Sequence, residues 1–284
     1  MTRAYYYLTK PGIIYGNAIT AAAGFFLASK GHIDWFLLIA MLIGLSLIIA
    51  SSCVFNNTLD RDIDSKMDRT RNRALVTGKI SIRNAVIFGI VLGFLGIKIL
   101  VLYTNFLTLG VALVGSVVYL LLYTPLKRKS IHGTLVGAIA GATPPVVGYT
   151  AVTNQLDLGA WLLFFILVAW QMPHFYAIAI RRSDEYAAAH IPVLPLKKGL
   201  RIAKINIMIY IVIFIITTIL LTVYHYTGYV YLIVMLSLGV FWLWYASLGF
   251  HQNIDNKLWA RKMFLYSLVV LLVFSLTVSI SAII

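Results

Sequence analysis

Residues 35–73 read WFLLIAMLIGLSLIIASSCVFNNTLDRDIDSKMDRTRNR, an apolar run that ends in a segment of mixed charge. The apolar part is long enough to cross a bilayer as a helix. The charged part holds four of the nine acidic residues in the chain. Asn56, Asp60 and Asp64 are one helical turn apart, so they share one face if the helix continues. Asp68 is expected to extend this row.

The row of acids predicts a bound cation. Like charges one turn apart on a helix repel by a few tenths of a kcal/mol. Carboxylates and an amide oxygen on one face form a hard-oxygen site that suits Mg²⁺ bound to a phosphate. The alternative is a solvated, charge-balanced loop at a membrane edge, but the spacing at the end of an apolar helix favours the metal site. Basic residues within the segment are natural phosphate partners: Arg61, Lys66, Arg69, Arg71 and Arg73.

Composition indicates a membrane protein. The chain is 61% hydrophobic and 11% charged, with a mean hydropathy of +0.91, which excludes a soluble domain. Its long continuous apolar runs predict an all-α polytopic protein, because a transmembrane barrel would show alternating strands of roughly ten residues. Cys53 is the only cysteine, which excludes a disulfide framework and a CxxC site.

Nine apolar segments predict about nine transmembrane helices in a single domain over residues 1–284. Very short links between several of them predict antiparallel neighbours. The segments are 12–29, 35–55, 84–104, 106–124, 133–152, 158–180, 203–224, 228–249 and 262–284.

Basic residues are distributed unevenly between the links. The N-terminus and the links after segments two, four, six and eight carry 21 of the 23 Lys and Arg residues; the exceptions are Lys30 and Lys98. The positive-inside rule places these links and the N-terminus in the cytoplasm and the C-terminus outside. The net charge of +14 thus reflects membrane topology rather than nucleic-acid binding, and the acid row faces the cytoplasm.

Polar or helix-breaking residues interrupt three other apolar segments. Pro144-Pro145 predicts either a bent helix that lines a cavity or close helix packing. Gln171 and His174 lie near the cytoplasmic end of segment six, where a lone His is more often an interior hydrogen-bonded residue than a ligand. Asn17 is a weaker interior candidate for substrate binding.

The ends of segments two and six are similar to each other. Both run from a polar helix end into a loop that mixes acids with Arg and Lys, and both should lie on one face of the membrane. Together they could hold a diphosphate from two sides. An isoprenyl diphosphate fits such a site, because its chain stays in lipid while its head meets the aspartates. Mg²⁺ and cationic side chains would stabilise the leaving diphosphate, and an aromatic cavity would shield the allylic cation from water.

Several motifs together carry a family resemblance. The chain is similar to the UbiA-type intramembrane prenyltransferases, and within them to the branch that farnesylates haem. The resemblance covers nearly the whole chain. The motifs are NNTLDRDIDSKMDRTRNR (56–73), YTPLKR (123–128), GATPPVVGY (141–149), WQMPHF (170–175) and IPVLP (191–195).

This resemblance implies a nine-helix bundle in the plasma membrane and a Mg²⁺-dependent reaction. A farnesyl group would pass from farnesyl diphosphate to a vinyl group of haem B, giving haem O and diphosphate. Haem O would serve a terminal oxidase directly or after conversion to haem A. The implied partners are therefore farnesyl diphosphate, haem B, the lipid bilayer, and a haem A synthase or terminal oxidase assembly.

The resemblance also implies roles for individual residues. Asn56, Asp60 and Asp64 carry over as the catalytic Mg²⁺-diphosphate site, with Asp68 as a further metal candidate. The second aspartate-rich motif of the superfamily is not matched cleanly, which leaves open the number of Mg²⁺ ions and the role of His174, a candidate contact to haem iron or propionate. The substrate-binding candidates are Asn17, Lys127, Arg128, Gln171, His174, Arg181, Asp184 and Glu185; Lys127 and Arg128, with Arg181 or Arg182, are the expected diphosphate and propionate partners.

Two other functions compete with haem farnesylation. A related prenyltransferase could act on an aromatic quinone precursor, but WQMPHF in place of an aspartate cluster argues against it. A transporter could bind a cation at the acid row, but it would place its ionisable groups near the bilayer midplane.

Overall fold

The computed structural model describes residues 2–281. Within this range nine helical spans are long and apolar enough to cross a membrane, which confirms the predicted all-α fold. The spans are α2 (Pro11–Ser29), α3 (Trp35–Leu59), α5 (Ile82–Tyr103), the α6–η1–α7 segment (Phe106–Leu126), the α8–α9 segment (Gly133–Thr153), α10 (Leu158–Arg181), α13 (Leu200–Val223), the α14–η2 segment (Tyr229–Phe250) and α15 (Asn256–Ser281).

Three spans that follow short links begin with a side chain that caps the helix. Asp34 accepts a hydrogen bond from the backbone N–H of Leu37 at the start of α3, and Asn105 and Asp157 make equivalent bonds at the starts of α6 and α10. Such caps satisfy backbone donors that have no partner within the helix. They account for how sharply these spans start after their short links.

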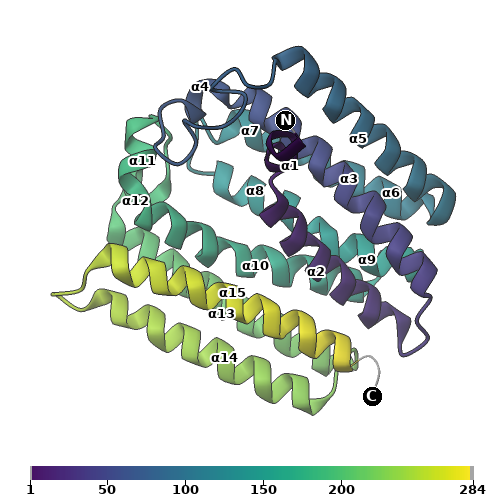
Figure 1. The fold of residues 1–284 in the computed structure, drawn as a ribbon. Coiled ribbons are helices and arrows are strands. Elements are labelled where there is room, and N and C mark those ends of the chain that lie inside the picture. The colour runs from purple at the N-terminus through teal and green to yellow at the C-terminus, as the bar shows by residue number, and fades with distance from the viewer. Residues whose placement is uncertain (1, 282–284) are drawn as a thin grey trace.

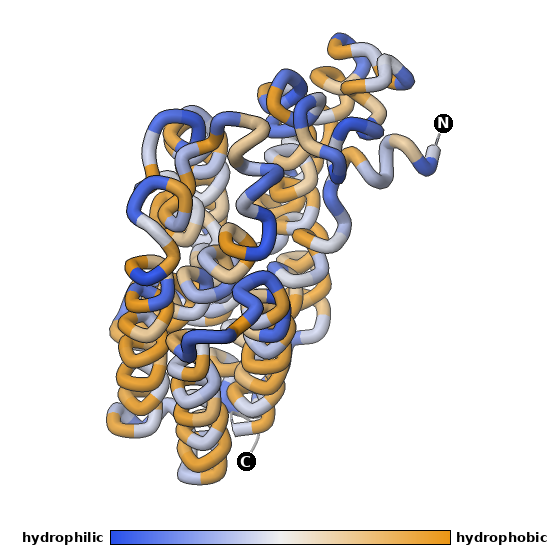
Figure 2. The backbone as a smooth tube through the Cα atoms, turned by 90° about the vertical axis from the view of Figure 1, so that its left-hand side faces the viewer, coloured by the Kyte–Doolittle hydropathy of each residue, from blue (hydrophilic) through white to orange (hydrophobic). Residues whose placement is uncertain are grey.

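The short helices gather at one end of the bundle. Figure 1 shows this cluster beside the N-terminus, while the long spans run away from it. In Figure 2 the long helices are mostly hydrophobic, and hydrophilic stretches concentrate in the segments that connect them. The short helices are α1 (Thr2–Leu8), α4 (Arg61–Asp64), α7 (Thr124–Leu126), α11 (Ser183–Ala188) and α12 (Leu194–Lys198). All of them belong to the N-terminal segment or to links predicted to be cytoplasmic; the orientation across the membrane remains a prediction.

The fifth span is broken at Ala142 into α8 (Gly133–Gly141) and α9 (Thr143–Thr153). Pro144 and Pro145 lie in the first turn of α9, where a missing N–H costs little, and both are buried. Close packing follows, because a Cβ atom on Gly148 would lie 1.8 Å from the carbonyl oxygen of Ala21 in α2. The proline pair thus bends the span and packs it against α2, and it does not line the cavity described below.

Candidate active site

A cavity of about 710 Å³ opens at the end of the bundle where the short helices gather. Its walls come from the N-terminal segment, the end of α3 with α4, η1 (Val118–Tyr123), the end of α10 with the α11–α12 region, and Phe264 of α15. The volume is in the range typical of small-molecule sites. Its lining includes charged side chains, and Phe175, Ile178 and Phe264 contribute apolar surface.

Asn56, Asp60 and Asp64 are buried and line one wall of the cavity. The helical hydrogen bonds continue past the end of α3: the Asp60 N–H donates to the Asn56 carbonyl at 2.9 Å, and the Asp64 N–H to the Asp60 carbonyl at 2.8 Å. The three side chains therefore share a face, as their spacing predicts.

Asp68 does not extend this row, so that prediction is wrong. The helix ends at Asp64, and the chain then turns, with the Thr70 hydroxyl donating to the Asp64 carbonyl at 2.9 Å. The turn directs the Asp68 side chain outward, where it is 85% exposed and lies 3.3 Å from Arg71.

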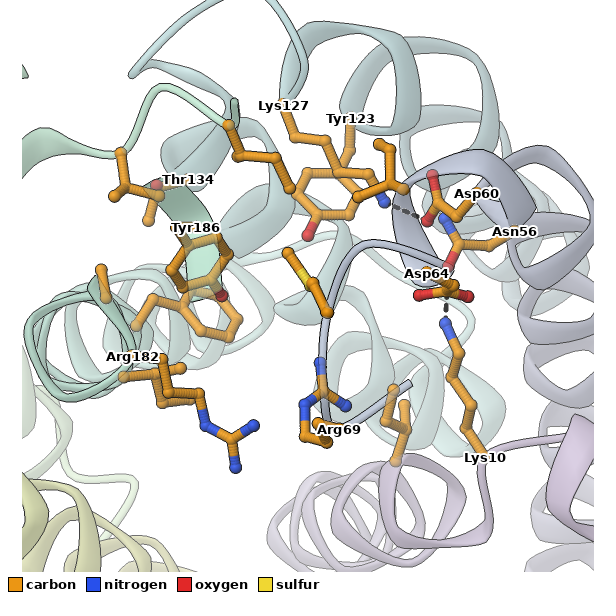
Figure 3. A pocket seen from close by; sticks show the side chains of 18 of the residues that line it. Lys10, Asn56, Asp60, Asp64, Arg69, Tyr123, Lys127, Thr134, Arg182 and Tyr186 are labelled. Carbon is orange, nitrogen blue, oxygen red and sulfur yellow. Dashed lines mark hydrogen bonds and ion pairs between the residues drawn. The ribbon is translucent and has the colours of Figure 1, made fainter. Parts of the chain in front are cut away.

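Basic side chains contact this wall, and Figure 3 labels two of them, Lys10 and Lys127. The Lys127 ammonium forms an ion pair with Asp60. Arg73 Nη1 donates to Asp64 Oδ2 at 2.6 Å, and Lys10 Nζ donates to Asn56 Oδ1 at 2.6 Å. These contacts show that the oxygen atoms of the row face cationic groups, which is the setting that a phosphate on a hard cation requires.

Two tyrosines line the cavity near the same wall. Tyr119 and Tyr123 stack with ring centroids 5.4 Å apart, and Lys127 Nζ lies 5.0 Å from the Tyr123 ring centroid. Both belong to η1, a six-residue π-helix, and such wide turns often occur at functional sites. Sequence reasoning missed the tyrosines; their one-turn spacing before Lys127 was the available signal. It also missed the contact of Lys10 with Asn56, because 46 residues separate them.

The family model described as the UbiA prenyltransferase family matches residues 17–268. The chain belongs to the UbiA prenyltransferase family. It is 50% identical over 278 residues to the protoheme IX farnesyltransferase of Protochlamydia amoebophila, with 98% of each chain covered. It is 48% identical over 283 residues to the protein of that name from Pectobacterium carotovorum, with 99% of this chain and 96% of that protein covered.

Solved structures of UbiA-type proteins share the fold. A chain described as digeranylgeranylglyceryl phosphate synthase superposes with a TM-score of 0.82 at 19% identity, covering 99% of this chain and 98% of that one. A UbiA homologue from Archaeoglobus fulgidus bound to GPP and Mg²⁺ superposes with a TM-score of 0.76 at 16% identity, covering 99% of each.

In this UbiA-family chain, three predicted substrate contacts lie outside the cavity lining. Gln171 is buried and donates to the carbonyls of Ala138 and Leu167, both at 3.0 Å, so it joins α10 to α8. His174 Nδ1 lies 2.7 Å from the Ser267 hydroxyl, as expected of an interior histidine. Asn17 donates to the Ile13 carbonyl within α2.

The charged stretch at the end of the sixth span, Arg181 to Glu185, contributes cations to the cavity rather than acids. Arg181 and Arg182 line the cavity, whereas Asp184 and Glu185 do not. Asp184 is exposed and lies 2.5 Å from Lys257, and Glu185 lies beside Arg182. The charged ends of the second and sixth spans therefore face one cavity, but among the charged residues of the sixth span's end only the arginines line it.

Arg128 also lies outside the cavity lining. Its guanidinium donates to both carboxylate oxygens of Asp62 at 2.8 Å and to the Leu59 carbonyl at 2.6 Å. The hydrogen bonds from Arg128 lower the pKa of Asp62 below its usual range. Its Nη2 also lies 3.4 Å from Asp60 Oδ1, so Arg128 joins both α4 and the row to the link after the fourth span.

The donor set of the row fits magnesium. Mg²⁺ in proteins is held by one or two carboxylates, with phosphate and water as its other ligands. Asp60, Asp64 and the amide of Asn56 supply this set. Within residues 2–281 no group of three or more His, Cys, Asp and Glu side chains is placed to hold a metal ion by itself, so the remaining ligands would come from substrate and water.

Proposed function

We propose that this protein transfers a farnesyl group from farnesyl diphosphate to a vinyl group of haem B, forming haem O and releasing diphosphate. One observation carries the proposal: a single cavity joins a buried carboxylate–amide row, faced by cations, to apolar and aromatic walls. Relatives about 50% identical over nearly the full chain are named protoheme IX farnesyltransferase, which supports haem as the acceptor.

Asn56, Asp60 and Asp64 would hold Mg²⁺ on the diphosphate, and Lys127 and Arg73 would orient the phosphate oxygens. When bound, the metal supplies positive charge that stabilises the leaving diphosphate. The cationic side chains act at the same place, because they already face the row at hydrogen-bond distance. In the substrate-free protein they neutralise the carboxylates instead.

The apolar part of the cavity would accommodate the reacting groups. The allylic C–O bond of farnesyl diphosphate breaks and a C–C bond forms to the terminal vinyl carbon of haem. Water then adds its hydroxyl to the cationic carbon beside the porphyrin, and its remaining proton is released. The stacked rings of Tyr119 and Tyr123 line the same cavity, and aromatic faces would attract an allylic cation formed there.

The proposal includes a location and partners. The family resemblance favours the plasma membrane, and the basic links favour a cavity that faces the cytoplasm. The product would pass to a terminal oxidase directly or after conversion to haem A, so an association with a haem A synthase or an oxidase assembly is a further prediction.

The direct test is to incubate the purified protein with haem B, farnesyl diphosphate and Mg²⁺ and to measure products by mass spectrometry. Haem B should gain a farnesyl group and a water, and an assay containing EDTA should give no product. A second candidate, transfer to an aromatic quinone precursor, is tested in parallel with 4-hydroxybenzoate. Unchanged haem with prenylation of the aromatic acid would replace the proposal with that alternative.

The Lys10 contact predicts a pH dependence of substrate binding. Burial lowers the pKa of Lys10 from 10.5 to about 8, so its ammonium is present below that pH and is lost above it. We expect the KM for farnesyl diphosphate to be steady below about pH 8 and to rise above it. Lys10→Arg should flatten the rise, because arginine stays charged. Identical profiles for the two proteins would remove Lys10 from diphosphate binding.

A further inference from the structure

Positive charge exceeds negative charge in the cavity. The described residues that line it include six cationic side chains and two carboxylates, which leaves four surplus positive charges. Lys127 and Arg73 pair with Asp60 and Asp64, so these two cations are already balanced. A magnesium–diphosphate complex removes little of the surplus, because the charge of the metal offsets that of the phosphates. The surplus therefore predicts a second anionic group in the same cavity.

Much of this surplus comes from Arg69, Arg181 and Arg182. Figure 3 shows Arg182 across the cavity from Asp60 and Asn56, with Arg69 between them. The side chains of Arg69 and Arg181 make no hydrogen bond or ion pair with the rest of residues 2–281, and Arg182 Nη1 is 3.6 Å from Glu185 Oε1, beyond hydrogen-bond distance.

The arginines also repel one another. Partial desolvation, and after it the charges of Arg182 and Arg73, lower the pKa of Arg69. Glu185, 3.6 Å from Arg182, is the one acid in ion-pair range of the three arginines among the described residues. Like charges that face one cavity with so little acidic compensation are stabilised when an anion binds between them. Guanidinium groups suit carboxylates in particular, because their planar fork donates two parallel hydrogen bonds.

Resting on the proposed haem acceptor, we propose that Arg181 and Arg182 bind the propionate carboxylates of the porphyrin and select a dicarboxylate acceptor. Both residues end α10, and the same helix carries Phe175 and Ile178 along the cavity wall. A porphyrin with its propionates at the arginines would lay its ring along this apolar surface. Arg69, between the two walls, would then separate the propionates from the diphosphate.

Guanidinium groups would also bind the diphosphate itself, so the experiment must distinguish the two anions. The acceptors are haem B and its dimethyl ester, which keeps the iron and both vinyl groups but lacks the charges. KM values for each acceptor and for farnesyl diphosphate are measured for the wild type, Arg181→Gln and Arg182→Gln. Arg201→Gln is the matched control, because Arg201 is exposed and outside the cavity.

With the wild type, we expect the KM for the ester to be about tenfold or more above the KM for haem B, because the ester loses the charge-assisted hydrogen bonds. Arg182→Gln should raise the KM for haem B about tenfold. The KM values for the ester and for farnesyl diphosphate should not change. Arg182→Lys keeps the charge but lacks the planar fork, so its KM for haem B should lie between those of the wild type and Arg182→Gln. Arg201→Gln should match the wild type.

Equal use of haem B and its ester, or a rise in the KM for farnesyl diphosphate alone, would overturn the propionate site. A wild-type protein that farnesylates neither porphyrin would instead contradict the proposed function. In that case absorbance titrations of haem B and its ester, on the wild type and on Arg182→Gln, still test the site. Binding that depends on neither the carboxylates nor Arg182 would overturn it.

Discussion

Asp60→Asn and Asp64→Asn should each lower the turnover rate at least about a hundredfold, a loss typical of removing one group that stabilises charge in a transition state. Both carboxylates are buried in the cavity wall and paired with cations. Asparagine keeps the shape but loses the charge that holds Mg²⁺. The measurement is the rate of haem O formation at saturating substrates and Mg²⁺, after size-exclusion chromatography has shown that each variant is folded.

Asp68→Asn is the matched control for these two variants. Asp68 belongs to the same predicted row, but its side chain is 85% exposed and outside the cavity. Its turnover rate should stay within about twofold of the wild type, because surface changes usually have small effects. Full activity in the Asp60 or Asp64 variant, or a large loss in the Asp68 variant, would contradict the geometry of the site.

Gly148→Ala should destabilise the protein by about 1–3 kcal/mol through overpacking. The added methyl would lie 1.8 Å from the Ala21 carbonyl oxygen, a backbone atom that cannot move without shifting α2. Because α2 follows directly after Lys10, the shift should also reduce activity. The fraction of monodisperse protein that survives heating in detergent measures the effect.

Gly110→Ala is the control for this variant, because it adds the same methyl group at a position where there is space for it. Gly110 lies within α6 (Phe106–Val117), and no atom is within 4 Å of a Cβ placed there. Alanine should stabilise the helix by up to about 1 kcal/mol, since glycine is the poorer helix former. Equal heat resistance of the two variants would indicate that α2 and α9 do not pack as closely as described.

The fold could be predicted from the sequence because each span is one long apolar run. The observed α3 starts where segment 35–55 was expected to start and continues four residues further, through Asn56 and Asn57 to Leu59. The last span is expected at 262–284, of which residues 282–284 lie outside the described residues, whereas α15 begins at Asn256. The first turns of α15 carry charged residues at the membrane edge, so they do not belong to the apolar run on which the prediction was based.

The candidate site could be predicted only where spacing along one helix sufficed. Asn56, Asp60 and Asp64 share a face through local hydrogen bonds, so one segment contains the signal. The prediction that Asp68 extends the row was wrong because nothing in the local pattern indicated the turn after Asp64. For Gln171 and His174 the sequence left a substrate contact and an interior role open, and their side chains turn to Ala138 and Ser267 on neighbouring helices. Those contacts depend on how the spans pack, which periodicity does not encode.

The central claim is that Asp60 and Asp64 hold the magnesium that binds the diphosphate. Equilibrium binding of farnesyl thiodiphosphate, a slowly reacting analogue, tests it without turnover. Titration calorimetry should show tight binding to the wild type with Mg²⁺, weak binding with EDTA, and no effect of Mg²⁺ on the doubly substituted Asp60→Asn, Asp64→Asn protein. An unchanged Mg²⁺-dependent affinity in the folded double variant would contradict the claim.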